Sequence, residues 1–280
     1  MSFIFGLSFL FTKNALDYTS PMNFIAIRFT FASLFMIILY FFNLIKLEKK
    51  HYYKLFIVAL FQPILYFIFE TSGLVYVPSS EAGILIATIP IFITFLSPII
   101  LKEKTPKINL LFVIFSFLGV ALIVGFNSFK GNFKGDLLIL GAVISAVFYN
   151  FSSKKLSSEF KPHEITFFMM IIGGVFFNIT ALIRGELNYK VLFNPSVFIS
   201  AIYLGVLSSS IAFFLVNFML SKVSPVQSSI FANLTTVISV LAGAIFRKEI
   251  ITINHIIGMI LIIFGIWGVN YFNYRFSIEK

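Results

Sequence analysis

The chain contains ten apolar runs, most of them near the length that crosses a lipid bilayer. A helix needs about 20 apolar residues to span the hydrocarbon core. Because the runs are continuously apolar and lack the alternation of barrel strands, they predict helices. We therefore expect an all-α integral membrane protein with ten transmembrane helices. The runs are Met1–Thr12, Phe24–Leu44, Tyr53–Val75, Ser80–Leu101, Ile108–Phe126, Gly135–Ser152, Ile165–Ile183, Val197–Leu220, Val226–Phe246 and Ile253–Phe272.

Composition supports a chain that lies mostly in lipid. Of the 280 residues, 59% are hydrophobic and 11% are charged, too few polar residues to cover a soluble domain of this length. Cysteine is absent, which excludes disulfides and thiolate metal sites. The net charge is +10, but the cations lie mainly between the apolar runs, where lipid headgroups and the positive-inside bias account for them. The expected partner is the lipid bilayer, and no nucleic acid is expected.

The first run is too short for a membrane span. Twelve helical residues rise about 18 Å, against a hydrocarbon core of about 30 Å. When Pro21 is aligned with Pro162, Met1 falls on Ala142, inside the sixth run. We therefore expect a truncated first helix, through a start codon assigned too far downstream or a fragment, in preference to a genuine half-helix. No cleaved signal peptide is expected.

The two halves of the chain share one design. A shift of 146 positions places Lys102–Glu103 on Lys248–Glu249, and in both halves this polar break separates two apolar runs. The layout predicts two copies of one unit, at residues 1–126 and 135–273. Five helices per copy is an odd number, so the copies run in opposite senses across the membrane. Inverted repeats of this kind are a common plan of secondary transporters, with the site near the midplane.

The distribution of cations predicts the orientation. With the N-terminus inside, thirteen of the 21 Lys and Arg residues fall on the inner side. This modest bias favours a multi-pass protein of the cell membrane with both termini cytoplasmic.

Several short segments resemble one known family. They include Gly6–Lys13, Ala26–Phe29 and Gly73–Ala82, together with the two basic-acidic breaks. The sequence resembles the EamA-type transporters of the drug/metabolite transporter superfamily over its whole length, apart from the shortened first helix. The resemblance implies two five-helix repeats in opposite orientation and a cavity lined mainly by helices one, three, four, six, eight and nine. It also implies transport of small metabolites, often amino acids or related compounds and frequently outward, without specifying the substrate.

No pattern of an enzyme or a cofactor site is found. The sequence has neither a GxxxxGK[ST] phosphate loop nor a GxSxG motif. His51, His163 and His255 stand apart, without the spacing of a metal site. We expect no enzyme activity, no cofactor and no metal. A membrane enzyme or a structural or sensory membrane protein is the alternative, and an enzyme should turn over substrate in detergent without a gradient.

Polar side chains inside the apolar runs are the candidate substrate-binding residues. Such groups are costly at membrane depth unless they face a cavity or a partner. Gln62, Tyr66 and Glu70 are four apart and are expected to share a helix face. For Asn217 and Asn233, an interhelical hydrogen bond and a substrate contact are equally good explanations. The ten candidates are Gln62, Tyr66, Glu70, Glu81, Tyr149, Asn150, Tyr203, Asn217, Gln227 and Asn233.

Glu70 and Glu81 support the sharpest hypothesis. Nine of the eleven acidic residues fall in predicted loops or tails, whereas Glu70 lies well within an apolar run and Glu81 in the first turn of the next helix. Two nearby carboxylates in a low-dielectric cavity repel each other when both are ionised, so at least one should have a raised pKa. Such a pair would suit a proton-binding site or a site that binds the ammonium group of a substrate. Proton coupling is thus one option. The alternatives are a helix-dipole role for Glu81 and a structural hydrogen bond for Glu70.

Three further features bear on packing and movement. Pro63, Pro90 and Pro98 lie inside predicted helices and allow kinks. The spacing of Gly83 and Ala87 predicts a close approach of two helices. Arg28 is expected near the start of the second helix, where it either snorkels to the interface or contacts an anionic substrate or a gate carboxylate. The sequence leaves the substrate, the coupling ion, the direction of transport and the oligomeric state open.

Overall fold

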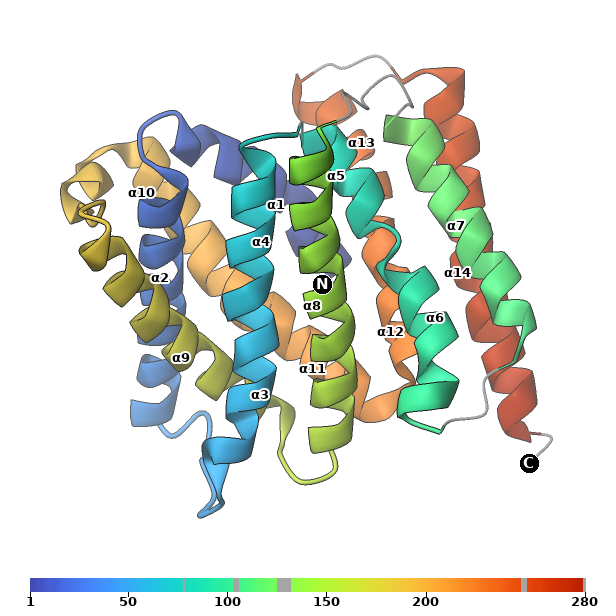
Figure 1. The fold of residues 1–280 in the computed structure, drawn as a ribbon, viewed down its shortest axis with the longest axis horizontal. Helices are drawn as coiled ribbons and strands as arrows, with labels where there is room; N and C mark the ends of the chain where they lie inside the picture. Colours follow the sequence, from blue (N-terminus) through green and yellow to red (C-terminus); the bar gives the residue numbers. More distant parts are fainter. Residues whose placement is uncertain (78, 103–105, 125–131, 248–250, 279–280) are drawn as a thin grey trace. The chain divides into compact units, whose positions relative to one another are not determined.

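The computed structural model describes residues 1–77, 79–102, 106–124, 132–247 and 251–278, and these are helices joined by turns and short loops (Figure 1). Two apolar helices of 10–17 residues are Ile108–Val124 and Pro225–Leu241. The expected all-α class is confirmed. Among the described residues, seven longer helices have the length and composition of membrane spans: Pro21–Phe41, Tyr52–Leu74, Ala82–Ile100, Phe133–Leu156, Pro162–Ile183, Pro195–Lys222 and Ile253–Phe276.

The chain forms two compact units. Unit 1 consists mainly of Phe3–Leu65 and Leu156–Ser221, and unit 2 mainly of Tyr66–Lys155 and Lys222–Lys280. The elements of unit 1 are α1 (Ser2–Leu16), α2 (Pro21–Phe41), η1 (Tyr52–Leu55), α3 (Phe56–Ala59), η2 (Leu60–Leu65), α9 (Pro162–Ile183), η4 (Tyr189–Phe193), α10 (Pro195–Ile202), η5 (Tyr203–Ile211) and α11 (Ala212–Lys222). Those of unit 2 are α4 (Tyr66–Leu74), α5 (Ser79–Ile86), α6 (Ile89–Ile100), α7 (Ile108–Val124), α8 (Phe133–Leu156), α12 (Pro225–Ile230), η6 (Phe231–Asn233), α13 (Leu234–Arg247) and α14 (Ile253–Ile278).

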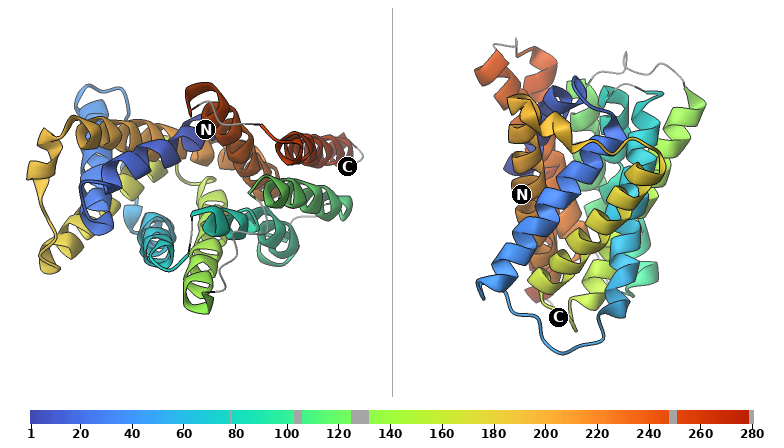
Figure 2. Two further views of the ribbon diagram at one scale, coloured as in Figure 1. Left: turned by 90° about the horizontal axis from the view of Figure 1, so that it is seen from above. Right: turned by 90° about the vertical axis from the view of Figure 1, so that its left-hand side faces the viewer.

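In unit 1, α2 lies along α9 (Figure 2). Helix α2 begins where the Ser20 side chain accepts a hydrogen bond from the Asn23 N–H and proline occupies the first helical position. The buried rings of Phe29 and Phe177 are 5.2 Å apart between centroids. Ser33 Oγ donates to the Met170 carbonyl across the pair at 2.7 Å, so the contact is partly polar.

In unit 2, α7 and α14 pack with their backbones close together (Figure 2). A Cβ placed on Gly119 would lie 2.5 Å from the Gly258 carbonyl oxygen, and one on Gly258 would lie 2.6 Å from the Gly119 carbonyl oxygen. Only glycine allows this approach, which is the usual way in which membrane helices gain packing energy.

Helix breaks interrupt four of the predicted runs. In unit 2, a turn at Ala87–Thr88 divides the fourth run into α5 and α6, and η6 divides the ninth into α12 and α13. In unit 1, Gln62 has extended angles, φ −148° and ψ 118°, within η2, and the eighth run contains the π-helical segment η5. The kink expected at Pro63 is therefore confirmed.

The break at Gln62 corrects one expectation about a shared helix face. The face that was to carry Gln62, Tyr66 and Glu70 is not continuous, because the backbone at Gln62 is not helical. Proline disfavours the helical conformation of the residue before it, which is the physical reason. Only Tyr66 and Glu70 lie on one regular helix, α4.

Three smaller expectations were wrong or changed. A Cβ on Gly83 would meet no described atom within 4 Å, so the Gly83–Ala87 spacing does not mark a close helix approach. Glu164, predicted in a loop, lies in the first turn of α9. Asp136, counted with the loop residues although it is the second residue of the sixth run, lies in the first turn of α8. Helix α1 has 15 residues and extends beyond the predicted run. Most of the two basic-acidic breaks (Glu103, Lys104, Lys248 and Glu249) lies outside the described residues.

Candidate functional site

A polar cluster inside unit 1 is centred on Arg28, the eighth residue of α2. Its Nε donates to Ser209 Oγ at 2.8 Å, and its Nη2 donates to Ser208 Oγ at 3.2 Å. Ser8 of α1 donates to the same Ser208 oxygen at 3.0 Å. Seven residues of helix rise correspond to about 10 Å, so Arg28 lies well past the start of α2. Its guanidinium donates hydrogen bonds to another helical segment, so the side chain does more than extend towards the membrane interface.

The serines of this cluster lie on η5, whose backbone runs close to α2. A Cβ on Gly205 would lie 2.8 Å from the Arg28 carbonyl oxygen and 2.6 Å from Phe31 Cβ. Glycine is therefore required where η5 crosses α2. π-Helical turns occur frequently at functional sites, because they displace side chains from the regular helical register.

Tyr203, the first residue of η5, connects the cluster to α1. Its hydroxyl donates to the Ile4 carbonyl at 2.9 Å, and its ring stacks on Phe11 with 4.0 Å between centroids. Of the candidates from the sequence, Tyr203 is the one that borders the Arg28 cluster through η5. Arg28 was expected near the start of the second helix, and neither it nor Ser208 or Ser209 was among the ten candidates.

Two other candidates make interhelical hydrogen bonds. Asn217 of α11 is fully buried and donates through Nδ2 to Thr166 Oγ1 of α9 at 3.0 Å. Asn233 of η6 is buried and donates through Nδ2 to Ser116 Oγ of α7 at 3.0 Å. These bonds hold neighbouring helices together, and substrate contact by either side chain stays a prediction.

Gln227 and Asn150 have local hydrogen-bond partners. Gln227 is the third residue of α12, and its backbone N–H donates to Ser224 Oγ at 3.3 Å while its side-chain oxygen faces the Ser224 N–H at 3.4 Å. This reciprocal arrangement is a capping box, which stabilises the start of the helix. Asn150 Nδ2 donates to the Ala146 carbonyl of its own helix, α8.

The remaining candidates lie mainly on α4 and α8. Tyr66 packs against the apolar core of unit 2, Glu70 is half-buried one turn further along α4, and Tyr149 of α8 is buried. Gln62 is buried in unit 1, and Glu81 lies in α5 with its side chain outside the described part of the chain.

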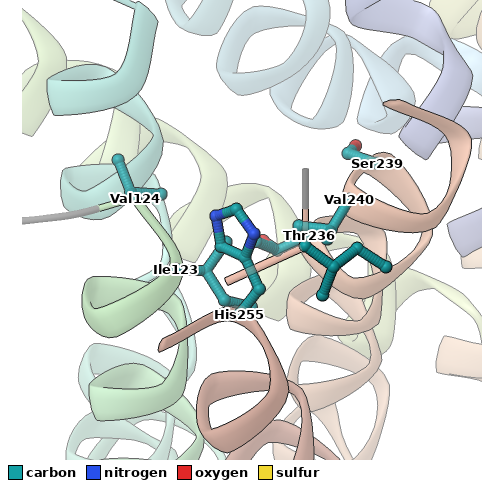
Figure 3. Close-up of a pocket in the computed structure, with 7 residues that line it drawn as sticks. Ile123, Val124, Thr236, Ser239, Val240 and His255 are labelled. Carbon is teal, nitrogen blue, oxygen red and sulfur yellow. The ribbon is translucent and has the colours of Figure 1, made fainter. Parts of the chain in front are cut away.

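Unit 2 contains a cavity of about 240 Å³ beside the first turn of α14. Figure 3 shows the His255 imidazole between the side chains of α7 and those of α13. His255 Nδ1 accepts a hydrogen bond from the Thr252 N–H at 3.2 Å, so the neutral ring carries its proton on Nε2 and is a donor there. The cavity presents two hydroxyls and an imidazole among aliphatic side chains. It is lined by Ile123, Val124, Thr236, Ser239, Val240, Ile251 and His255.

An ionic cluster around Glu164 was not found from the sequence. The side chain of Glu164 is fully buried, and its oxygens accept hydrogen bonds from Lys161 N at 2.7 Å, Tyr52 Oη at 2.7 Å, Glu48 N at 3.2 Å and Lys50 Nζ at 3.2 Å. The cluster fixes the loop between α2 and η1 on the start of α9. The run Lys161–Pro162–His163–Glu164, with proline first and glutamate third in the helix, is the signal that could have revealed the helix start.

Glu48 of the same cluster is exposed and ion-paired. Its carboxylate lies 2.6 Å from Lys161 Nζ and 2.9 Å from Lys50 Nζ. Hydrogen bonds from Lys161 and then Lys50 lower the pKa of Glu48 to about 2. The bond to Glu48 in turn raises the pKa of Lys50.

The helices therefore define a multi-pass membrane protein, and comparison with known proteins specifies its class. The model of the EamA-like transporter family matches residues 1–125 and 133–271. A Bacillus subtilis protein described as an uncharacterized transporter, YcxC, is 38% identical over 96% of this chain and 90% of its own length. An uncharacterized transporter of Archaeoglobus fulgidus is 29% identical over 94% of this chain and 93% of its own.

The chain belongs to the EamA-like transporter family. The resemblance seen in the sequence is thus confirmed. A protein of known crystal structure shares the fold, with a TM-score of 0.84 over 98% of this chain and 95% of its own, at 16% identity.

Proposed function

We propose that the protein is a secondary transporter that moves a small metabolite across the cell membrane by alternating access. Export of an amino acid or a related compound is the expected activity. The relatives are described as transporters, which supports transport, and the proposal adds the mechanism, the direction and the substrate class.

The observation that carries the proposal is the pairing of helix breaks between the two halves of the chain. The 146-residue shift places the break at Ala87–Thr88 on Asn233–Leu234, where η6 meets α13. The segment η2, which contains the break at Gln62, and the π-helical segment η5 also follow corresponding elements, a short 3₁₀ turn and a short α-helix, in each half. Interrupted helices at matching positions of two repeats are a feature of transporter binding sites.

The same pairing supports ten membrane helices in two inverted repeats. Seven long spans, two shorter apolar helices and α1 together supply ten helices, five in each half. The family model matches each half separately, at residues 1–125 and 133–271. Under this proposal both termini are cytoplasmic, in accord with the cation bias.

Within the transport path we assign two kinds of residue. Glu70 and Glu81 supply a carboxylate for a proton or for a substrate ammonium. The polar side chains Tyr66, Tyr149 and Asn150 are proposed to face the substrate beside them. Gln62, Tyr203, Asn217, Gln227 and Asn233 stay proposed as further contacts.

A metabolite screen with reconstituted protein tests the proposal. Proteoliposomes of the chain and empty vesicles would be compared for uptake of amino acids, amines, organic acids and nucleosides, with and without a proton gradient. We expect at least one class to move faster into the proteoliposomes. If no class does under either condition, the transporter proposal fails; turnover of a compound in detergent without a gradient would instead indicate the membrane enzyme.

A further inference from the structure

The C-terminal end of α2 and the segment that follows it form an open groove. Asn43 has φ +57°, and its N–H donates to the Tyr40 carbonyl while the Leu44 N–H donates to the Leu39 carbonyl, both at 3.0 Å. This is a Schellman motif, in which the chain reverses sharply after the helix. The reversal leaves a cavity of about 360 Å³ between the last turn of α2 and the following segment. We call it the α2 groove, lined by Tyr40, Phe41, Asn43, Ile45, Lys46 and Leu47.

Contacts with α9 hold the far side of the α2 groove in place. His163 Nε2 lies 3.0 Å from the Lys46 carbonyl oxygen, and the Glu48 N–H donates to Glu164 Oε1 at 3.2 Å. The helix end and these contacts fix the groove from both sides. In Figure 2 this loop continues from the end of α2 towards α3.

The cations near the α2 groove differ in their ion pairing. Lys50 pairs with Glu48 and Glu164, and Lys54 pairs with Glu159 at 2.8 Å. Among the described residues, no carboxylate lies within ion-pair distance of Lys46 or Lys49, both of which are exposed. The positive charge that lines the groove is therefore available to an external anion.

Exposed aromatic rings near the end of α2 support a position of the α2 groove at the membrane–water interface. Phe41 and Phe42 are 76% and 73% exposed, and Tyr53 is 74% exposed. Aromatic rings at the end of a membrane helix are typical of the headgroup level, and lysines there attract anionic lipids. An occupant of the groove thus meets an ammonium and an amide at one side and apolar rings at the other.

We propose that the α2 groove binds an anionic phospholipid, with its phosphate on the Lys46 ammonium and the Asn43 amide and its acyl chains along Tyr40 and Phe41. The volume lies within the range of about 300–1,000 Å³ that is usual for small-molecule sites. Both headgroup classes carry a phosphate, but a zwitterionic lipid also brings a cation near Lys46, so charge complementarity favours the anionic lipid. The proposal is independent of the transported substrate.

Lipid retention by the full chain in neutral detergent, measured by native mass spectrometry, tests the site. Phosphatidylglycerol and phosphatidylcholine with the same acyl chains would be titrated separately, with inorganic phosphate as a competitor. Lys46→Gln is the test variant, and Asn43→Gly is a second one that keeps the left-handed backbone but removes the amide. Lys190→Gln is the matched control, since Lys190 is an exposed lysine of the same unit, on η4.

Wild-type protein should retain phosphatidylglycerol in preference to phosphatidylcholine. Lys46→Gln should weaken phosphatidylglycerol binding about fivefold, the effect of one lysine at a membrane surface, and should weaken phosphatidylcholine binding less. Lys190→Gln should bind like wild type. Equal retention of both lipids, an equal loss in Lys190→Gln, no loss in Lys46→Gln, or displacement of the lipid by millimolar inorganic phosphate would each overturn the proposal.

Discussion

Removal of the Glu164 carboxylate should destabilise the protein more than removal of any exposed acidic side chain. Glu164→Ala deletes the acceptor of four hydrogen bonds, two of them from the backbone N–H groups of Lys161 and Glu48. A donor left without its acceptor in a buried site costs about 1–3 kcal/mol, and breaking a buried ion pair by removing one partner costs about 3–5 kcal/mol. Because Lys50 keeps Glu48 as a partner, we expect the lower end, about 3 kcal/mol.

The matched control is Glu159, whose carboxylate pairs with Lys54 at 2.8 Å but is 41% exposed. Exposed pairs contribute about 0–1 kcal/mol. At about 2–4 °C per kcal/mol, Glu164→Ala should lower the melting temperature by about 6–12 °C and Glu159→Ala by no more than about 4 °C. Glu164→Gln should lie between them, since an amide keeps one acceptor oxygen.

Thermal unfolding in detergent, followed by fluorescence-detected gel filtration, measures both variants on the same scale. Equal melting temperatures for Glu164→Ala and Glu159→Ala would refute the reasoning, because they would mean that the four hydrogen bonds contribute no more than an exposed pair. The reasoning would also fail if Glu164→Ala melted within about 3 °C of wild type, about 1 kcal/mol.

The thermal stability measured in this assay should depend on pH. Because the pKa of Glu48 is lowered to about 2, its contribution to stability is fully present above the ordinary glutamate value of 4.5 and is lost as pH falls towards 2. Lys50 has a raised pKa, so its contribution is present below 10.5 and is lost as pH rises beyond that. Glu48→Gln should therefore flatten the acid limb of the stability profile, and an unchanged limb would contradict the ion pairs described.

Three further changes test the transport path, the topology and the packing. Glu70→Gln should fold and insert normally but lose most transport or its pH dependence; a wild-type rate and pH profile would remove Glu70 from the mechanism. Cysteines introduced at Lys102 and Arg247, into a chain that has none, should react with impermeant reagents from opposite sides of the membrane, and labelling from one side would exclude five helices per repeat. Gly258→Ala should destabilise by about 1–3 kcal/mol through overpacking against α7, whereas Gly83→Ala should be neutral or stabilising, and equal melting temperatures would contradict the packing.

The helices themselves could be predicted from the sequence. In lipid every backbone N–H and C=O group needs a hydrogen-bond partner within the segment. A continuous apolar run of membrane length is therefore expected to form a helix. The predicted starts at Ile108 and Ile253 coincide with those of α7 and α14, and most other ends differ by a few residues. Pro63 likewise determines a local break, since its effect on the preceding residue depends on neighbouring atoms alone.

Packing partners were decided by the tertiary structure. Glu164 meets Lys50 and Tyr52, which are more than a hundred residues earlier in the chain, and no local pattern specifies that meeting. Gly83 and Gly119 are equally small, yet only Gly119 faces another backbone, because the face of an apolar helix that packs against protein has the same composition as the face that meets lipid. For a membrane protein the solvent therefore determines which segments are helices, and contacts distant in sequence determine which side chains of those helices meet.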